Sequence, residues 1–476
     1  MRTISDKEII KRIEIENPWW SEGSAIDDYF RSMRPRAYLE SLYELITKKD
    51  VNRAVVLMGP RRVGKTVMLY HTVQRLIESG APPQKILYVS IESPTYIGLS
   101  LERILKYYFD AHNIQQFKGC YVFFDEIQYL KGWEIHLKKL VDNFREIRFV
   151  VSGSAAAALK LKSIESGAGR FTNFLLPPLT FYEYLSLLNK DALITESEEI
   201  SGFISYSYAA ADIRKLNEEF VNYLNFGGYP EALFSEAIKA DPQRYIRSDI
   251  IDKVLMRDLP SLYGIDDIQE LNRLFTILAY NTGNEVSLDE LSKGAGVAKN
   301  TIKKYLEYLE AAFLIKIFHR IDQAGKRFRR ENYFKGYLTN PSMRCALFGP
   351  ISSDDAFMGN MTETAIVSQW IHSPQFDRLY YSRWQGGEVD IVYMSVDGVD
   401  WCVECKWTNR FFERPEELKN LISFVLKNRK NECSVTTFDK NGVHIHNGVR
   451  IEYSESSVYC YTVGRNLTRR KGQAER

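Results

Sequence analysis

Residues 59–66 read Gly59-Pro60-Arg61-Arg62-Val63-Gly64-Lys65-Thr66. An apolar run, residues 54–58, precedes this stretch, and residues 67–73 follow it with apolar side chains at helical spacing. A strand, a glycine loop and a helix in this order, with Gly, four residues and then Gly-Lys-Thr, match the phosphate-loop pattern. The glycines let backbone N–H groups surround phosphate oxygens, and the helix adds the positive end of its dipole. The stretch therefore predicts a nucleotide-binding domain built on a parallel sheet.

The phosphate loop also assigns roles to its residues. We expect Lys65 to reach the outer phosphates of ATP as a positive charge, and the hydroxyl of Thr66 to ligate Mg²⁺. The residues expected to contact the nucleotide are Gly59, Pro60, Arg61, Arg62, Val63, Gly64, Lys65, Thr66 and Val67. The alternative, a chance Gly-Lys-Thr in a surface turn, does not explain the apolar strand and the helix on its two sides. ATP and Mg²⁺ are therefore the predicted cofactors.

A second motif follows the apolar run of residues 121–124, which ends in Asp125-Glu126. An acidic pair at the end of a buried parallel strand would lie beside the phosphate loop. Asp125 then holds Mg²⁺, directly or through a water, and Glu126 orients and deprotonates the attacking water. An acidic turn after a core strand is the alternative. Together with the phosphate loop, the pair predicts ATP hydrolysis.

Two further residues belong to the predicted nucleotide site. Ser152 ends a fourth apolar strand, residues 148–152, and would lie between the two motifs, where it can sense the γ-phosphate. Arg170 follows in the glycine-rich stretch of residues 167–171. It is a candidate arginine finger, acting within its own chain or from a neighbouring subunit of a homo-oligomer. The alternative for Arg170 is an ordinary solvated arginine.

Charge and composition narrow the class of protein. The 476 residues carry 63 Lys and Arg against 61 Asp and Glu, and this balance argues against a histone-like binder. No apolar run approaches the length of a membrane span, and the first residues lack the apolar core of a signal peptide. Six scattered cysteines suit a reducing compartment. We therefore expect a cytoplasmic protein without membrane contact.

Five stretches of the chain together resemble a known family. They are the phosphate loop, Phe-Phe-Asp-Glu-Ile-Gln at 123–128, Ser-Gly-Ser at 152–154, Leu-Pro-Pro-Leu-Thr-Phe-Tyr-Glu-Tyr at 176–184 and Gly-Gly-Tyr-Pro-Glu-Ala at 227–232. In these motifs the chain is similar to archaeal and bacterial AAA-like ATPases that carry a C-terminal domain of unknown function (DUF4143). The resemblance covers nearly the whole chain after residue 30. It implies an AAA-like P-loop domain of the ASCE type followed by further domains.

Residues 287–309 read as two helices joined by a glycine turn. The second helix has an apolar stripe and an outward basic face made of Lys299, Lys303 and Lys304. With a strand at 314–318 as the first wing, the segment predicts a winged helix whose second helix enters a DNA major groove. Contact with a protein instead of DNA is the alternative. The basic run at 326–330 either follows a phosphate backbone or is a solvated linker.

Two more strands, residues 388–393 and 401–407, are joined by a loop that contains a hairpin signal, Asp-Gly. If their apolar side chains, Val389 among them, meet on one face, then Asp390, Glu404 and Lys406 share the other face. Two carboxylates and a lysine suit a divalent cation and a water that is activated to attack a phosphodiester.

This second constellation resembles the restriction-endonuclease-like fold. Asp390 and Glu404-x-Lys406 stand at the motif positions, and Glu363 matches the acidic residue on the first helix of that fold. Val389 stands where the motif usually has proline. The resemblance implies that Glu363, Asp390 and Glu404 hold metal and that Asp390, Glu404 and Lys406 are catalytic. A relative that keeps the fold only for binding is the alternative.

The chain as a whole is predicted to be a multidomain α/β protein. Its parts are a preamble (1–30), an AAA-like domain (31–190), a helical lid (191–265), a winged helix (266–325), a nuclease-like domain (326–460) and a basic tail (461–476). One hypothesis is a DNA-directed ATPase with a metal-dependent nuclease. The other is a nucleotide-controlled binding switch that recruits protein partners and cleaves nothing.

Overall fold

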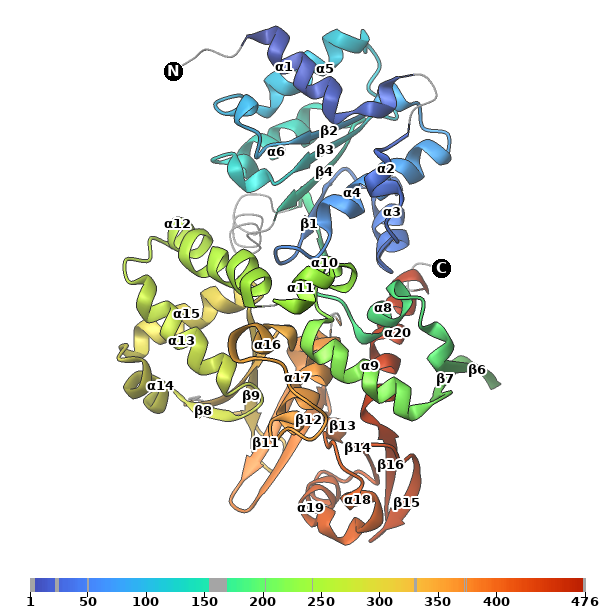
Figure 1. Cartoon of the computed structure of the whole chain (residues 1–476), viewed down its shortest axis with the longest axis vertical. Helices are drawn as coiled ribbons and strands as arrows, with labels where there is room; N and C mark the ends of the chain where they lie inside the picture. The colour runs from blue at the N-terminus through green and yellow to red at the C-terminus, as the bar shows by residue number, and fades with distance from the viewer. Residues whose placement is uncertain are drawn as a thin grey trace. The chain divides into compact units, whose positions relative to one another are not determined.

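The structure is a computed structural model of the 476-residue chain. It describes residues 5–21, 25–48, 51–153, 169–201, 203–241, 243–328, 332–371, 373 and 375–473. The chain divides into two compact units, residues 1–177 with 471–476, and residues 178–470. Each unit has a sheet of its own (Figure 1). The boundary falls before the predicted end of the AAA-like domain, because Phe181 and Leu185 are buried in the core of the second unit.

The first unit is built on a five-stranded parallel sheet with the order β2-β3-β4-β1-β5. Its strands are β1 (Ala54–Met58), β2 (Ile86–Ser90), β3 (Tyr121–Asp125), β4 (Arg148–Gly153) and β5 (Phe171–Leu175). Four of them were predicted from buried apolar runs. The fifth, β5, carries exposed and half-buried side chains and therefore lacks such a run. The predicted parallel-sheet domain is confirmed.

Helices cover both faces of this sheet (Figure 1). They are α1 (Asp6–Glu16), α2 (Asp28–Arg31), α3 (Leu39–Thr47), α4 (Lys65–Glu78), α5 (Leu101–His112) and α6 (Trp133–Asn143). Apolar residues of α1, α5 and α6 share one core with alternate strand residues such as Val56 and Phe124. Helices α2, α3 and α4 pack together.

The N-terminal preamble is anchored on the edge strand β2. Asn17 exchanges two hydrogen bonds with the backbone of Tyr88, donating at 2.7 Å and accepting at 2.6 Å. The indole N–H groups of Trp19 and Trp20 both donate to the carbonyl of Ile86, at 3.1 and 2.8 Å. An amide side chain thus replaces the neighbouring strand that this edge lacks.

The second unit is built on a nine-stranded mixed sheet with the order β15-β16-β14-β13-β12-β11-β9-β10-β8. Its strands are β8 (Glu285–Ser287), β9 (Ile315–Ile321), β10 (Tyr333–Leu338), β11 (Leu379–Trp384), β12 (Gly387–Ser395), β13 (Gly398–Glu404), β14 (Glu432–Thr437), β15 (Gly442–His446) and β16 (Val449–Glu455). Parallel pairing of β9 with β11 joins the predicted wing strands to the predicted nuclease-like strands. The two predicted domains therefore share one sheet.

The helical elements of the second unit surround this sheet. They are α8 (Phe181–Leu187), α9 (Ile213–Phe226), α10 (Pro230–Phe234), α11 (Glu236–Ala240), π-helical turns (Gln243–Asp252 and Val254–Asp258), α12 (Leu259–Tyr263), α13 (Ile268–Tyr280), α14 (Leu288–Ala295), α15 (Lys299–Ala311), α16 (Ser342–Phe348), α17 (Met358–Trp370), α18 (Arg410–Glu413), α19 (Lys419–Lys427) and α20 (Ser456–Gln473). No helix among the described residues combines the length and the apolar character needed to cross a bilayer.

Three sequence-based expectations differ from this unit. The segment 191–265 begins with a hairpin, β6 (Ile194–Ser201) with β7 (Phe203–Ala210), instead of helix. The basic tail continues α20, where Arg469 pairs with Glu196 at 2.5 Å. The sheet is also buried on both faces, by α17 on one side and α19 on the other, rather than on one.

Candidate functional site

The phosphate loop connects the buried strand β1 to helix α4 in the first unit. Gly64 ends the loop at φ 90°, a conformation that favours glycine. A Cβ atom built on Gly59 would lie 2.1 Å from the carbonyl oxygen of Leu176, so this position also excludes a side chain. Both glycines of the motif are therefore required by the backbone path itself.

Three residues of the predicted nucleotide site meet at the start of α4. The Thr66 hydroxyl donates to Oδ2 of Asp125 at 2.7 Å, and the Tyr88 hydroxyl donates to the same oxygen at 2.8 Å. Lys65 is buried and donates to the loop carbonyls of Gly59 at 3.0 Å and Pro60 at 2.7 Å. A hydroxyl and a carboxylate oxygen at one position fit the ligand set of Mg²⁺.

Glu126 and Ser152 complete this site. Glu126 has a left-handed backbone (φ 53°), and its N–H donates to Oδ1 of Asp125 at 3.1 Å. Ser152 lies on β4, between the strands that carry the two motifs, and its hydroxyl donates to the same Asp125 oxygen. A non-glycine residue with positive φ is costly and is retained where the surrounding structure fixes it. The structure therefore brings Thr66, Asp125, Glu126 and Ser152 together.

Arg170 lies at the opposite edge of the sheet from the phosphate loop. Its carbonyl accepts the N–H of Ala54, the first residue of β1, and its guanidinium pairs with Asp142 at 2.5 Å. The phosphate loop follows the last residue of β1, roughly 15 Å away at the rise of a strand. The Arg170 guanidinium is thus paired with Asp142 and not with the phosphate loop, and its role as an arginine finger, within its own chain or on a neighbouring subunit, stays a prediction. Residues 154–168 lie outside the described residues.

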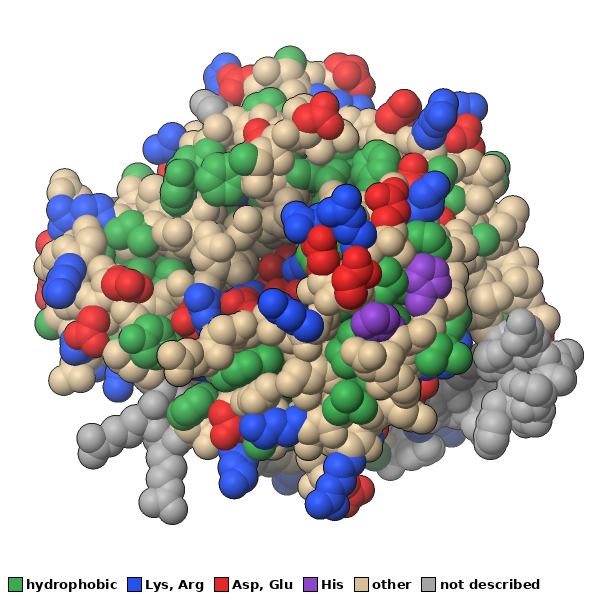
Figure 2. Space-filling view, turned by 90° about the horizontal axis from the view of Figure 1, so that it is seen from below, with side chains coloured by type: hydrophobic (Ala, Val, Ile, Leu, Met, Phe, Trp, Pro, Cys, Tyr) green, Lys and Arg blue, Asp and Glu red, His purple; other side chains and the backbone are tan. Residues whose placement is uncertain are grey.

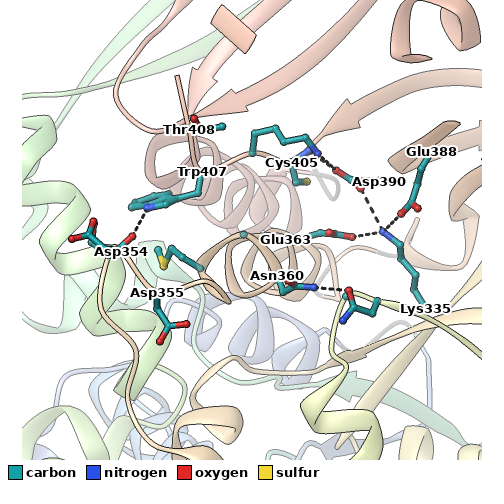
Figure 3. A pocket seen from close by; sticks show the side chains of 16 residues that line it. Lys335, Asp354, Asp355, Asn360, Glu363, Glu388, Asp390, Cys405, Trp407 and Thr408 are labelled. Atoms are coloured by element: carbon teal, nitrogen blue, oxygen red, sulfur yellow. Dashed lines mark hydrogen bonds and ion pairs between the residues drawn. The ribbon is translucent and has the colours of Figure 1, made fainter. Parts of the chain in front are cut away.

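The second candidate site is a cavity of about 490 Å³ in the second unit. Strands β10 and β12, helix α17 and the segment after β13 contribute side chains to it (Figure 3). Its charged lining residues are Lys335, Asp354, Asp355, Glu363, Glu388, Asp390 and Lys406. Three of the four residues predicted from the endonuclease-like motif are among them.

Lys335 lies at the centre of this cluster. Its ammonium contacts Oε1 of Glu363 at 2.8 Å, Oε1 of Glu388 at 2.5 Å and Oδ1 of Asp390 at 3.4 Å (Figure 3). Only 2% of its side chain is exposed. The Tyr337 hydroxyl donates to the same Glu363 oxygen at 2.5 Å. Carboxylates from helix α17 and strand β12 thus converge on one buried ammonium group of β10.

Asp390 links this cation to a second one. Its Oδ2 accepts the N–H of Cys405 at 2.9 Å and contacts the Lys406 ammonium at 3.3 Å. Lys406 also contacts Oε1 of Glu404 at 2.8 Å, whereas Oε2 of Glu404 is buried and has no hydrogen-bond partner in the described part of the chain. A buried, unpartnered carboxylate oxygen is costly, and a bound cation would satisfy it.

The register of β12 and β13 explains how these side chains meet. Ile391 lies opposite Val403, as the alternation of apolar residues predicted. A β-bulge against β11 then places two residues, Asp390 and Ile391, opposite one. Val389 consequently packs with the α19 core and not with Ile391, which corrects the predicted face of Val389.

Comparison with known proteins identifies the first unit. Residues 51–185 match the model of an AAA domain, and residues 217–354 match that of a domain of unknown function, DUF8612. Residues 51–185 are thus an AAA-like P-loop ATPase domain. The second match ends before β12 and β13, so the DUF4143 assignment and the endonuclease-like fold stay predictions.

Two similar proteins match this chain over much of its sequence. An uncharacterized protein of Haemophilus influenzae is 27% identical over 306 residues, 61% of this chain and 68% of that one. Another, of Methanocaldococcus jannaschii, is 25% identical over 333 residues, 67% of this chain and 68% of its own. The solved structure of a Walker-type ATPase of Pyrococcus abyssi overlays with a TM-score of 0.39 at 16% identity, covering 67% of this chain and 99% of that one.

Burial and charge set the protonation of the second site. Burial, with a contribution from the Asp390 charge, raises the pKa of Glu363 to about 7 and that of Glu404 to about 7. Burial alone would also raise the pKa of Asp390, but Lys406 and Lys335 hold it below its ordinary value. Burial would lower the pKa of Lys335, and the carboxylates around it raise that pKa well above its ordinary value. Asp390 and Lys335 are therefore charged at neutral pH.

The sequence-based prediction did not include Lys335 or Glu388. The signal in the sequence was Lys335, the single charged residue of the apolar strand 333–338. A lysine is buried in such a strand only when carboxylates pair with it, so its presence indicates acidic partners elsewhere in the chain. The predicted metal ligands Glu363, Asp390 and Glu404 do not surround one point, because Lys335 lies between Glu363 and Asp390 and Lys406 lies between Asp390 and Glu404. Among the described residues, no group of three or more His, Cys, Asp or Glu is arranged to hold a metal ion.

We expect Mn²⁺ binding by this cluster to strengthen as the pH rises from 6 to 8. Cations bind deprotonated carboxylates, and Glu363 and Glu404 lose their protons near pH 7. Each proton released adds up to about tenfold in affinity per pH unit. Titration calorimetry of the full chain at both pH values measures this, and Glu363→Gln should reduce the dependence. Equal affinity at pH 6 and pH 8 would contradict it.

Proposed function

We propose that the first unit binds and hydrolyses ATP with Mg²⁺. The observation that carries this proposal is the 2.7 Å contact between the Thr66 hydroxyl and Asp125, which places both expected Mg²⁺ ligands at one point beside the phosphate loop. Thr66 and Asp125 would hold the ion, which when bound neutralises charge on the outer phosphates. Lys65 would exchange the carbonyls of Gly59 and Pro60 for phosphate oxygens.

The remaining residues act on the water and on the γ-phosphate. Glu126, fixed by its strained backbone, orients the attacking water and accepts its proton. Ser152 touches Asp125 and stands where the γ-phosphate can be sensed. Arg170 would act as an arginine finger on the γ-phosphate, within its own chain or from a neighbouring subunit of a homo-oligomer.

Lys65→Ala should abolish ATP binding, because the outer phosphates lose their contact with the Lys65 ammonium group. Glu126→Gln should keep binding and lower turnover by about 100-fold or more, because the water loses its base. Phosphate release and binding of a fluorescent ATP analogue measure the two effects. Exposed Glu146, elsewhere in the same unit, provides the control Glu146→Gln. Normal turnover in Glu126→Gln would refute the assignment of the base.

We further propose that the second unit contacts DNA through α15. Ser287 caps α14 and Gly296 ends it at φ 71°, after which α15 buries Ile302 and Leu306 and exposes Lys303 and Lys304. With α13 before them and strands β8, β9 and β10 beside them, this order of elements supports a winged helix. Lys299 is paired with Asp289, so Lys303 and Lys304 are the more available cations.

Replacing Lys299, Lys303 and Lys304 by alanine should weaken duplex DNA binding. Fewer counterions would be released, so the slope of log affinity against log salt should fall by up to about 3. Fluorescence anisotropy at several salt concentrations measures both quantities. Alanine at Lys106, Lys138 and Lys139, exposed in the first unit, removes the same charge as a control. Unchanged slopes in the α15 variant would assign this helix to a protein partner.

A second activity, cation-dependent phosphodiester cleavage, is proposed for the cavity of the second unit. The buried, unpartnered Oε2 of Glu404, whose other oxygen contacts the cavity-lining Lys406, favours it, because Oε2 offers a ligand which nothing in the described chain uses. Glu363 and Asp390 would hold a divalent cation in place of the Lys335 ammonium, and the bound ion would supply an activated water. Lys406 contacts both Asp390 and Glu404 and would stabilise charge beside that water.

Asp390→Asn should abolish Mg²⁺- or Mn²⁺-dependent cleavage and leave ATP hydrolysis unchanged, because it removes the charge that both lysines share. Incubating the full chain with single- and double-stranded DNA and RNA tests this, and Asp397→Asn, in the exposed β12–β13 turn, is the control. If the wild-type chain cleaves none of these substrates while it hydrolyses ATP, the nucleotide-controlled binding switch becomes the better account.

A further inference from the structure

A patch of aromatic and arginine side chains lies where β9, β10 and β11 begin and end. We call it the aromatic patch and define it as Arg320, Arg327, Phe328, Tyr333 and Arg383. Phe328 is 42% exposed and Tyr333 is 44% exposed. Both aromatic rings therefore present much of their surface to solvent. Of the basic run predicted to follow a phosphate backbone, Lys326, Arg327 and Phe328 are described, and residues 329–330 lie outside the described residues.

One guanidinium holds the two rings. The Cζ atom of Arg320 lies 5.3 Å from the centre of the Phe328 ring and 5.6 Å from that of Tyr333. Arg320 is itself fixed, because it donates to the carbonyl of Arg383 at 2.9 Å and pairs with Glu285 at 3.5 Å. The rings are therefore held by a side chain that is anchored to the sheet, and little side-chain entropy is lost when a ligand stacks on them.

The patch is continuous with the cavity of the second unit. Arg383 pairs with Glu388 at 3.1 Å, and Glu388 lines the cavity and contacts Lys335 at 2.5 Å. Arg327 extends the patch on the other side, with its guanidinium 4.8 Å from the centre of the Tyr380 ring. A linear ligand that lies across the two rings would therefore reach the cavity past Arg383 and Glu388.

The chemistry of the patch selects its ligand. Solvent-exposed aromatic rings flanked by guanidinium groups can stack with unpaired bases, which a duplex does not offer. The described patch with Lys326 holds four cationic side chains against three carboxylates, Glu285, Asp322 and Glu388, so its net charge of about one favours an anionic chain. Figure 2 shows basic and acidic side chains interspersed over the visible face, so local groups rather than a broad basic field must supply the attraction.

We propose that the aromatic patch binds single-stranded nucleic acid. Two bases stack on Phe328 and Tyr333, and their phosphates lie beside Lys326 and Arg327. The proposal deepens the cleavage proposed for the cavity, because it names an unpaired strand as the substrate. Binding itself requires neither a metal ion nor ATP.

Fluorescence anisotropy with labelled twelve-nucleotide dT and rU strands, in EDTA and without ATP, tests the proposal. We expect Phe328→Ala and Tyr333→Ala each to weaken binding by about 5- to 100-fold, and Phe328→Trp and Tyr333→Phe to retain it. Phe348→Ala, at a 37% exposed ring on α16, is the control and should change nothing. A preference for dT or rU identifies which strand the patch takes.

An abasic strand of the same length separates stacking from charge. The wild-type chain should bind it as weakly as the double alanine variant binds dT. Equal wild-type affinity for the abasic and the dT strands would overturn the proposal, as would unchanged binding by both alanine variants. No binding of either strand by the wild type would overturn it in favour of a protein ligand. Because metal and ATP are absent, these results do not depend on whether the chain cleaves or hydrolyses anything.

Discussion

The second unit depends on one buried ammonium group. Lys335 of β10 contacts carboxylates from α17 and β12. One of these carboxylates, Asp390, also contacts the ammonium group of Lys406. Removing one partner from such a buried network leaves a charge without compensation, at a cost of about 3–5 kcal/mol. Both β10 and β12 belong to the predicted nuclease-like part, and β10 pairs with β8 and β9 of the predicted winged helix, so the cluster lies where the two predicted parts join. The continuous sheet and the ion cluster make them one folding unit.

The same interaction defines the chemistry of the cavity. If the cluster binds a divalent cation as proposed, that ion competes with the Lys335 ammonium for Glu363 and Asp390, which the ammonium contacts at 2.8 and 3.4 Å. Burial, followed by the charge of Asp390, raises the pKa of Glu363 and of Glu404 to about 7, so these two carboxylates are only partly charged beside the two lysines at neutral pH. A site of this kind is stable without metal and still has a ligand to offer, the free oxygen of Glu404.

The sequence predicted the parallel-sheet ATPase-like domain and brought together Thr66 and Asp125, and it anticipated part of the second cluster. Lys65 and Thr66 are fixed by a local motif, and Asp125 follows because parallel strands end at one edge of a sheet. The pairing of Ile391 with Val403 followed from apolar alternation. Lys335 was missed because it is 55 residues from Asp390 in the chain, and no local pattern encodes that contact. The bulge that moves Val389 and the edge position of Arg170 depend likewise on neighbouring strands.

The central claim is that a divalent cation binds the second site by displacing the Lys335 ammonium from Glu363 and Asp390. It is tested most directly by anomalous diffraction from crystals of the full chain at pH 8 with saturating Mn²⁺. The account predicts an anomalous peak bonded to carboxylate oxygens of Asp390 and Glu363, with the Lys335 ammonium displaced from between them. Absence of that peak, with Lys335 still in contact with both carboxylates, would contradict the claim.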